Sequence, residues 1–252
     1  MNRQYERVVQ FSGGIASFAS AVRVVRRYGP DRTTLLIADT QIEDPDLWRF
    51  SQDASRLLDV PLVRVADGRD PFQVFHDKKF LGNSRIAGCT RALKIDPCLR
   101  WLQKNADPEQ TTLYIGIDAS TRDRNRIPPI ATNWHPWRTV FPLCEEGEPE
   151  LTKEELLDEA RSLGIEPPRL YGMGYSHNNC GGTCVRAGKA QWIRTLHLFP
   201  ERYAMAETQE EEFRRANGDY AILKEQRNRV VYPLTLRELR LREEARQAAS
   251  AQ

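Results

Sequence analysis

The sequence predicts an α/β fold in which a mostly parallel sheet of about five strands lies between helices. Short runs rich in β-branched residues alternate with longer runs of helical periodicity, and this pattern continues to about the middle of the chain. The second of the short runs is apolar through its middle, as expected for a strand covered on both faces. The rest of the chain is predicted to be rich in helices and loops.

The first predicted elements are a strand and a helix. The run ERVVQF is rich in β-branched residues, and the helix after it places Phe18, Val22 and Val25 on one face. Gly29 begins the Gly-Pro pair that ends this helix. The predicted strands are 6–11, 33–40, 61–66 and 111–117.

Further helices are indicated by their start signals. Pro45 fits the first position of a helix, whereas Pro97 is expected to kink or restart one. Thr152 and Glu155 match a capping box. The predicted helices are 17–28, 45–58, 89–104, 151–163, 208–225 and 236–249, with loops at 67–88 and 118–137 and a glycine-rich stretch at 171–192.

Composition bounds the class of protein. The 252 residues are 40% hydrophobic, enough for a packed core, and the net charge of +2 does not by itself indicate a nucleic-acid binder. No apolar run approaches the ~20 residues of a membrane helix, so a cytoplasmic location without a membrane partner is expected. The five cysteines lack compact disulfide spacing, which favours thiols, metal ligands or redox groups.

The stretch FSGGIAS at 11–17 is the first candidate site. It lies between the first strand and the first helix, where ligands bind in open α/β sheets. Glycines let backbone N–H groups approach an anion there, and the helix start adds partial positive charge. The string is neither a Walker loop nor a dinucleotide fingerprint, and an ordinary glycine turn is the alternative. The candidate donors are Ser12, Gly13, Gly14 and Ser17.

Several later strings follow this loop in a characteristic order. They are LLIADTQIEDPDLWRF, CTRALKIDPCLRWL, LYIGIDASTRDR, FPLCEEGE and PRLYGMGYSHNNCGGTCVRAG. Together with the loop they resemble the PP-loop ATP pyrophosphatase superfamily, and within it the phosphoadenylyl-sulfate (PAPS) reductase-like family. The resemblance extends from Val8 to Trp192.

The resemblance implies an adenine nucleotide α-hydrolase-like, Rossmann-like fold that binds ATP or an adenylyl-sulfate nucleotide. Members of the superfamily cleave ATP between its α and β phosphates, usually with Mg²⁺, and release pyrophosphate. The resemblance implies catalytic roles for Ser12, Ser17, Lys94 and Arg122. Stand-alone relatives occur in phages, plasmids, DNA-modification clusters and CRISPR-associated loci, so a role in nucleic-acid modification, sulfuration or defence is implied.

One position departs from the pattern of the superfamily. ATP pyrophosphatases usually read Ser-Gly-Gly-x-Asp-Ser, whereas Ala16 stands here in place of the aspartate. Another acid would then serve Mg²⁺, and the candidates are Asp39, Asp118 and Asp123.

Residues at the ends of two strands are further candidates for nucleotide binding. Asp39 ends the second strand, where the resemblance implies a contact with the adenosine; capping of the next element is the alternative. Gly116 and Asp118 end the fourth strand, where glycine permits close approach of a nucleotide.

Basic residues give a second set of candidates. Arg91 and Lys94 are spaced to share a helix face, and the resemblance implies that they hold phosphates; a solvated basic face is the alternative. Arg122, Arg124 and Arg126 follow the fourth strand. The resemblance implies that an arginine there reaches the anionic end of the nucleotide, and a nucleic-acid backbone is an equal alternative.

The cysteines suggest a metal centre or plain thiols. Cys89, Cys144, Cys180 and Cys184 are the candidate ligands of an iron–sulfur cluster or zinc, although the Cys-x-x-x-Cys spacing of the last two is weakly diagnostic. Some relatives carry clusters on comparable cysteines, but their double-cysteine string is absent here. Cys98 is expected in the core.

The expected organisation is a nucleotide-binding α/β domain at 1–145 and a helical, cysteine-containing region at 146–252 packed on it. The leading hypothesis is an enzyme that converts ATP to AMP and pyrophosphate and adenylates an acceptor. A sulfonucleotide (PAPS or APS) reductase and a non-catalytic nucleotide- or nucleic-acid-binding accessory protein are the alternatives. The expected partners are an adenine nucleotide and a nucleic-acid or protein acceptor, and a homodimer is an open option.

Overall fold

The computed structural model describes residues 5–83 and 87–250, which form two compact units. The first unit contains the described residues up to Asp39 together with Glu43–Asp67 and Lys94–Asn179. The second contains Thr40–Ile42, Gly68–Leu93 and the residues from Cys180 onward. Each unit is therefore built from segments that are distant in the sequence.

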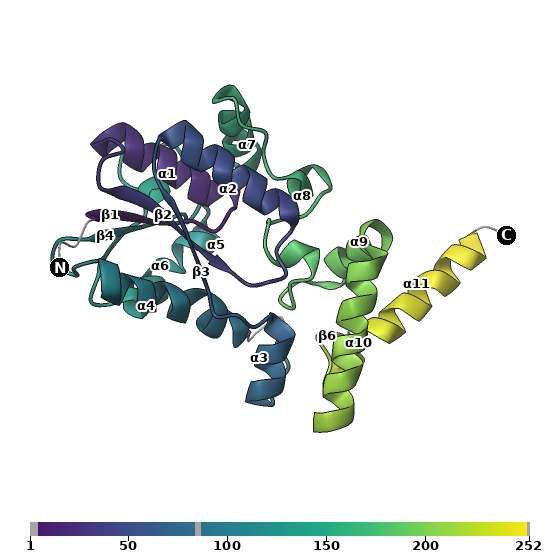
Figure 1. Cartoon of the computed structure of the whole chain (residues 1–252). Helices are drawn as coiled ribbons and strands as arrows, with labels where there is room; N and C mark the ends of the chain where they lie inside the picture. Colours follow the sequence, from purple (N-terminus) through teal and green to yellow (C-terminus); the bar gives the residue numbers. More distant parts are fainter. Residues whose placement is uncertain (1–4, 84–86, 251–252) are drawn as a thin grey trace. The chain divides into compact units, whose positions relative to one another are not determined.

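The first unit contains a five-stranded, fully parallel sheet with strand order β3-β2-β1-β4-β5. This confirms the predicted fold class. Figure 1 labels the first four strands of the sheet. The fifth strand follows the predicted loop at 118–137 and was not assigned from the sequence. The strands are β1 (Arg7–Gln10), β2 (Thr33–Asp39), β3 (Leu62–Ala66), β4 (Thr112–Ile115) and β5 (Arg138–Val140).

Helices cover both faces of this sheet (Figure 1). Val9 and Leu35 pack against helices α1, α2 and α7, whereas their neighbours Val8 and Leu36 pack against α4 and α6, because successive side chains of a strand point to opposite faces. The helices of the first unit are α1 (Ile15–Tyr28), α2 (Pro45–Leu58), α4 (Asp96–Asn105), α5 (Thr121–Arg124), α6 (Ile127–Trp134), α7 (Lys153–Ser162) and α8 (Arg169–Gly172), with a 3₁₀ turn η2 (Pro142–Cys144).

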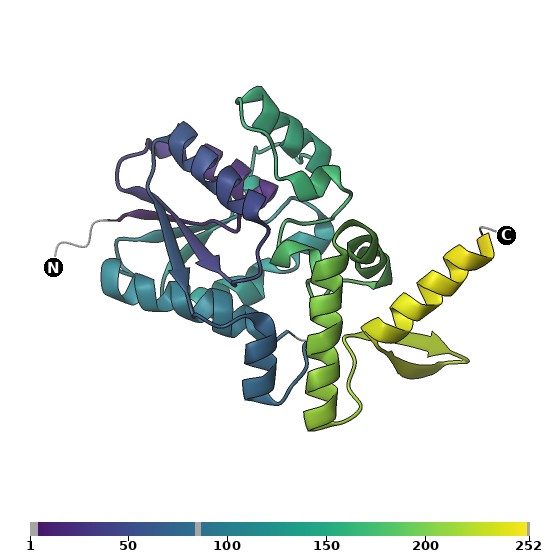
Figure 2. The same ribbon diagram turned by 45° about the vertical axis from the view of Figure 1, so that its right-hand side comes forward.

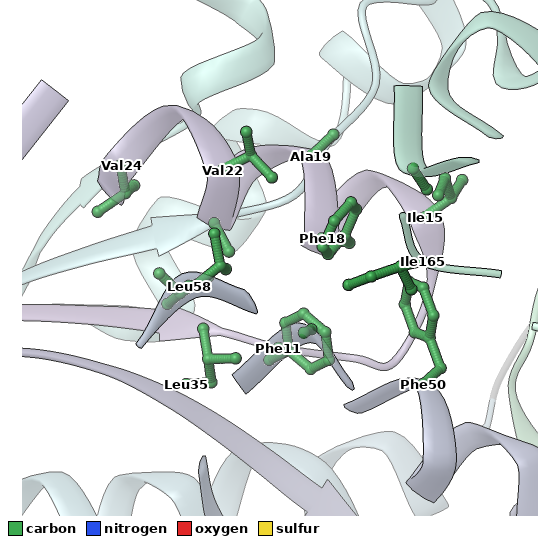
Figure 3. Close-up of a cluster of buried hydrophobic side chains, with 14 of the residues drawn as sticks. Phe11, Ile15, Phe18, Ala19, Val22, Val24, Leu35, Phe50, Leu58 and Ile165 are labelled. Carbon is green, nitrogen blue, oxygen red and sulfur yellow. The ribbon is translucent and has the colours of Figure 1, made fainter. Parts of the chain in front are cut away.

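Aromatic packing fixes the start of α1 on the sheet. Phe18 lies in the first turns of α1, and its ring centroid is 5.4 Å from that of Phe50 on α2. Phe11, which follows β1, stacks 6.4 Å from the same Phe50 ring, and Figure 3 shows these rings with Ile15 in one cluster. The junction between β1 and α1 is therefore anchored from both sides.

Four predicted segments differ from the structure. The predicted loop at 67–88 contains a helix started by a capping box on Asp70, and the loop at 118–137 contains two short helices. The helix predicted at 89–104 begins as a π-helical segment, η1 (Thr90–Ile95), and restarts at Asp96 next to Pro97. The helix predicted at 208–225 begins earlier, at Pro200, and ends at Asn217, and residues 223–225 belong to a strand instead.

The second unit is mainly helical and has its own core around Trp192, Tyr203 and Phe213. Phe72 and Phe75 belong to the same core, although they come from the segment that precedes η1. Figure 2 shows its antiparallel hairpin beside α11. The elements are α3 (Pro71–Lys78), η3 (Cys180–Gly182), α9 (Lys189–Leu198), α10 (Pro200–Asn217), β6 (Leu223–Arg227), β7 (Val230–Leu234) and α11 (Leu236–Ser250).

The observed division differs from the predicted boundary between 145 and 146. Helix α7 contributes Leu156, Leu157 and Ala160 to the core beside α1, and Glu159 binds Arg23 of α1 at 2.5 Å. Residues 146–179 therefore belong with the sheet. Among the helices that the structure describes, none is long and apolar enough to cross a membrane.

Candidate functional site

The candidate site lies at the centre of the sheet. β1 is the middle strand, with β2 on one side and β4 on the other, so the strand order reverses between β1 and β4. In open α/β sheets, such a switch point opens a crevice beyond the carboxyl ends of the strands, and ligands bind there. The glycine loop that follows β1 lies at this position.

The loop needs both of its glycines. Gly13 has a φ of +70°, which L side chains rarely adopt, and a Cβ atom there would lie 2.5 Å from Cγ of Leu47. A Cβ atom on Gly14 would lie 3.2 Å from the hydroxyl of Tyr171. Gly14 is the N-cap of α1 and supplies no side-chain cap. Backbone groups therefore line the start of the helix.

The two serines of the loop have different roles. The buried Ser17 donates its hydroxyl hydrogen to the carbonyl of Gly14 at 2.7 Å and accepts the backbone N–H of Ser12 at 3.2 Å. Ser17 therefore closes the loop. Ser12 is exposed, and its hydroxyl lies 3.2 Å from that of Ser17. Of the two, Ser12 is the one that solvent and ligands can reach.

Two residues that the sequence reasoning missed hold the loop from outside. The Tyr171 hydroxyl on α8 accepts the N–H of Ile15 at 3.1 Å, and the Asn178 side-chain amide donates to the carbonyl of Gly13 at 2.9 Å. Burial raises the pKa of Tyr171, so the hydroxyl stays protonated. Its O–H remains available as a donor beside the loop. Nothing local in the sequence marks these contacts, because both partners lie more than 150 residues from the loop.

Helix α8 is fixed in turn to the start of α2. Arg169 donates two hydrogen bonds to the buried carboxylate of Asp44, at 2.9 and 2.8 Å. Asp44 also caps α2 by accepting the N–H of Asp46 at 3.0 Å. The paired arginine and carboxylate therefore position Tyr171 over the helix start.

The end of β4 closes the opposite side of the loop. A Cβ atom on Gly116 would lie 2.6 Å from the backbone N and Cα of Ser17, so only glycine allows this approach. The carboxylate of Asp118 accepts the N–H of Ser120 at 3.0 Å and the hydroxyl of the same serine at 2.5 Å. Gly116 thus shapes the site, whereas Asp118 shapes the turn after it.

Lys94 brings a positive charge to the residues beside the loop. Its ammonium donates to Oδ1 of Asn179 at 3.0 Å and lies 3.6 Å from Oε1 of Glu43, whose side chain is 2% exposed. Asn179 directly follows Asn178, which holds the loop. Burial and the nearby ammonium groups lower the pKa of His177 in the same segment, so it is neutral at pH 7. Glu43 and Asn179 were not predicted as site residues.

Asp39 is buried at the end of β2 and forms an ion pair with Arg64 of β3. The Nε atom of Arg64 lies 3.1 Å from the Asp39 carboxylate, and its guanidinium stacks 3.9 Å above the ring of Trp48. The charge of Asp39 is thus compensated inside the protein, and its predicted contact with adenosine stays a prediction.

The predicted arginines are not all brought together. Arg91 belongs to the second unit and Lys94 to the first, within one π-helical segment. The wider π-helical turn does not stack residues three apart, so the expected shared α-helical face is absent. Arg124 and Arg126 pair with Glu150 and Asp123. The Arg122 side chain lies outside the part of the chain that the structure describes.

The four-cysteine metal centre is not supported. None of the five cysteines forms a disulfide in the described structure, and no three His, Cys, Asp or Glu side chains within 5–83 and 87–250 are grouped to hold a metal ion. Cys144 belongs to the first unit, and its thiol donates to the carbonyl of Ile117 at 3.5 Å. Cys89, Cys180 and Cys184 belong to the second unit. The described residues thus give no grouping that would hold a metal, and the iron–sulfur or zinc site stays a prediction.

The comparisons with known proteins do not show a family for this chain. No family model and no curated protein matches the chain. Among solved structures, it is similar to phosphoadenylyl-sulfate (PAPS) reductase from Candida auris in its phosphate complex, with 11% sequence identity and a TM-score of 0.42. The match covers 67% of this chain and 78% of that chain. A likeness of this extent carries no conclusion about activity.

Proposed function

We propose that the first unit binds an adenine nucleotide by its phosphates at the loop between β1 and α1 and cleaves the bond between the α and β phosphates. The observation that carries this proposal is the glycine turn at the switch point of the sheet, with Gly116 packed against it. The adenine base and the cleaved bond come from the sequence resemblance to PP-loop ATP pyrophosphatases.

The loop offers donors suited to a phosphate. The first N–H groups of a helix have no hydrogen-bond partner within the helix. Among the first three residues of α1, all of them described, the structure records a partner only for the N–H of Ile15. The N–H group of Ala16 and the exposed Ser12 hydroxyl are therefore available to phosphate oxygens, whereas the backbone N of the buried Ser17 lies against Gly116. Lys94 would add the compensating positive charge, as the phosphates bring several negative charges.

The proposed reaction needs positioning more than covalent catalysis. An oxygen of water or of an acceptor attacks the α-phosphorus, the bond to the bridging oxygen breaks, and pyrophosphate leaves with the electron pair. Ser17 would act as a positioning residue because its hydroxyl already holds Gly14. Ser12 and Lys94 would touch the phosphates, and Arg122 would stabilise the developing charge.

Mg²⁺ would arrive on the triphosphate. It needs only one or two protein carboxylates when substrate phosphates supply other ligands. Of the acids proposed for it, Asp39 is paired with Arg64 and Asp123 with Arg126, which leaves Asp118 as the candidate that forms no ion pair in the described structure. The ion would neutralise charge on the leaving pyrophosphate.

The sulfonucleotide reductase alternative finds little support in the first unit. Such a reductase needs a reactive thiolate. Burial raises the pKa of the Cys98 thiol to about 12, and burial also raises the pKa of Cys144. Neither thiol near the sheet is activated. Binding without turnover is the stronger alternative, because Ala16 supplies no carboxylate to the loop and Tyr171 already occupies the N–H of Ile15.

Product analysis with ATP and Mg²⁺ tests the proposal. AMP with pyrophosphate is the expected result, and ADP with phosphate would contradict it. Binding of a non-hydrolysable ATP analogue without any product would favour the accessory role. Substitution of Ser12 by alanine should weaken binding of that analogue about tenfold, as expected for one lost hydrogen bond to a charged group. Ser162→Ala, at an exposed serine of the same unit, is the matched control.

A further inference from the structure

The two units differ in charge although the chain is nearly neutral. The second unit has 18 lysines and arginines against 12 aspartates and glutamates, whereas the first has 19 against 23. The net charge of +2 therefore conceals a basic second unit and an acidic first unit. A basic unit attracts polyanions and is repelled by a second copy of itself.

A hollow of about 340 Å³ lies in the second unit, between one face of the hairpin and the segment that follows α3. The hairpin register pairs Lys224 with Pro233 and Gln226 with Val231. Because side chains alternate along a strand, these residues share one face, while Glu225 and Tyr232 lie on the other. The groove is lined by Phe80, Asn83, Tyr220, Lys224, Val231 and Pro233.

Two aromatic rings border this groove and remain open to solvent. Tyr220 is 48% exposed and Phe80 is 38% exposed. The Tyr220 ring is supported by an edge contact with the buried Phe213, at a centroid distance of 5.9 Å, and Arg214 donates to the Tyr220 carbonyl. The contact with Phe213 thus positions the Tyr220 ring, and about half of the residue's surface remains accessible.

The charges around the groove are unevenly compensated. Arg214 pairs with Asp219, the acidic residue of the groove lining. The exposed Lys224 has no ion pair within the described residues, and neither does the exposed Lys79 beside Phe80. The groove therefore combines accessible rings with one ammonium group, that of Lys224, that forms no ion pair in the described structure.

We propose that this groove binds single-stranded nucleic acid, with bases stacked on Tyr220 and Phe80 and a backbone phosphate on Lys224. Aromatic faces beside basic groups suit bases and phosphates of one flexible strand, and stacking accepts any base. A duplex keeps its bases stacked inside and cannot use the rings. A second copy of the chain fits poorly because it would bring two basic units together. The proposal does not depend on the nucleotide site of the first unit.

Fluorescence anisotropy with a labelled 20-nucleotide strand of mixed sequence tests the proposal on the full chain. We expect binding that weakens with salt and is at least tenfold tighter than for a duplex of the same length. Tyr220→Ala should weaken binding about tenfold through the lost stacking. The logarithm of the binding constant falls as the logarithm of the salt concentration rises. Lys224→Gln should make this slope less steep by about 0.7, as expected for one lost phosphate contact.

Matched variants keep the test specific. Tyr232→Ala removes a tyrosine of similar exposure, 46%, from the opposite face of the same hairpin and should leave binding unchanged. Lys104→Gln removes an exposed lysine of the first unit and should leave the slope unchanged. Equal losses in Tyr220→Ala and Tyr232→Ala, equal affinity for strand and duplex, or full competition by polyglutamate would each overturn the proposal.

Discussion

At the scale of single residues, the site depends on contacts that the local sequence could not reveal. The glycine loop was predicted because two glycines after a strand have few structural explanations. Tyr171 and Asn178 reach the loop from a segment far along the chain, and no pattern within either segment indicates the pairing. Asp39 was recognisable as an acid at a strand end, but its pairing with Arg64 depends on the register of two strands.

The Tyr171 hydroxyl should contribute measurably to stability. Tyr171→Phe removes the acceptor of the Ile15 N–H, so we expect the free energy of unfolding to fall by about 1 kcal/mol. Urea denaturation followed by circular dichroism measures the change. Tyr232→Phe removes an exposed hydroxyl for which the described structure records no hydrogen bond and should have no effect. Equal stability of Tyr171→Phe and the wild type would contradict the assigned contact.

Lys94 should stabilise the buried Glu43 as well as bind phosphate. Lys94→Met takes the ammonium away from a carboxylate that is almost fully buried, and we expect a loss of about 1–2 kcal/mol in the free energy of unfolding. Adding Glu43→Gln should restore part of that loss, because the charge that needs compensation is gone. Urea titrations of both variants measure this. Lys104→Met, at an exposed lysine of the same unit, is the control. If Glu43→Gln restores none of the stability lost in Lys94→Met, the coupling between Lys94 and Glu43 is refuted.

At the scale of elements, the sequence predicted those whose signals are local. The structure confirms the predicted capping box of α7 and the predicted end of α1 at a glycine. The segment 218–225 was wrongly assigned to a helix because its charged residues suit a solvated helix as well as an exposed hairpin. Its pairing with Val230–Leu234 decides between them, and a turn with positive φ at Asn228 and Arg229 makes that pairing possible.

A buried carboxylate joins three elements of the second unit and should make its stability depend on pH. Glu210 of α10 accepts the N–H of Ile222, just before β6, at 2.8 Å and the N–H of Leu236, which begins α11, at 2.6 Å. Burial raises the pKa of Glu210 from 4.5 to about 7. The folded protein therefore binds this proton more tightly than the unfolded chain.

The free energy of unfolding should consequently fall as the pH rises from 4.5 to about 7, by at most about 3 kcal/mol, and then level off. Denaturation at a series of pH values measures this slope. Glu210→Gln does not titrate and should flatten it, at the cost of one acceptor for a backbone N–H. A slope that is unchanged in Glu210→Gln would assign the effect to other groups.

At the scale of the whole molecule, the predicted parallel sheet is confirmed and the predicted domain boundary is not. The local hydrophobic periodicity indicates the order of strands and helices, so the fold class could be predicted. The domain boundary could not be predicted, because α7 is as rich in charged residues as helices α10 and α11 of the second unit. Only its packing on α1 assigns it to the sheet.

The different net charges of the two units predict that the chain binds polyanions through its second unit. We expect it to bind immobilised heparin at neutral pH and to elute with added salt, despite its small net charge. Changing Lys79 and Arg215 of the second unit to glutamine should lower the eluting salt concentration. The same changes at Lys104 and Arg138 of the first unit remove equal charge and should have a smaller effect. Equal shifts for both pairs would contradict the expectation.

The origin of the second unit in separated segments has a consequence for synthesis on the ribosome. Phe72 and Phe75 need Trp192, Tyr203 and Phe213 to complete their core, and more than a hundred residues of chain separate the two groups. At a translation rate of about 5–20 residues per second, roughly 6–28 seconds pass after these two residues are added before their partners are made. During that interval, α3 presents an apolar face that chaperones can recognise, and the second unit closes only after the sheet has been translated.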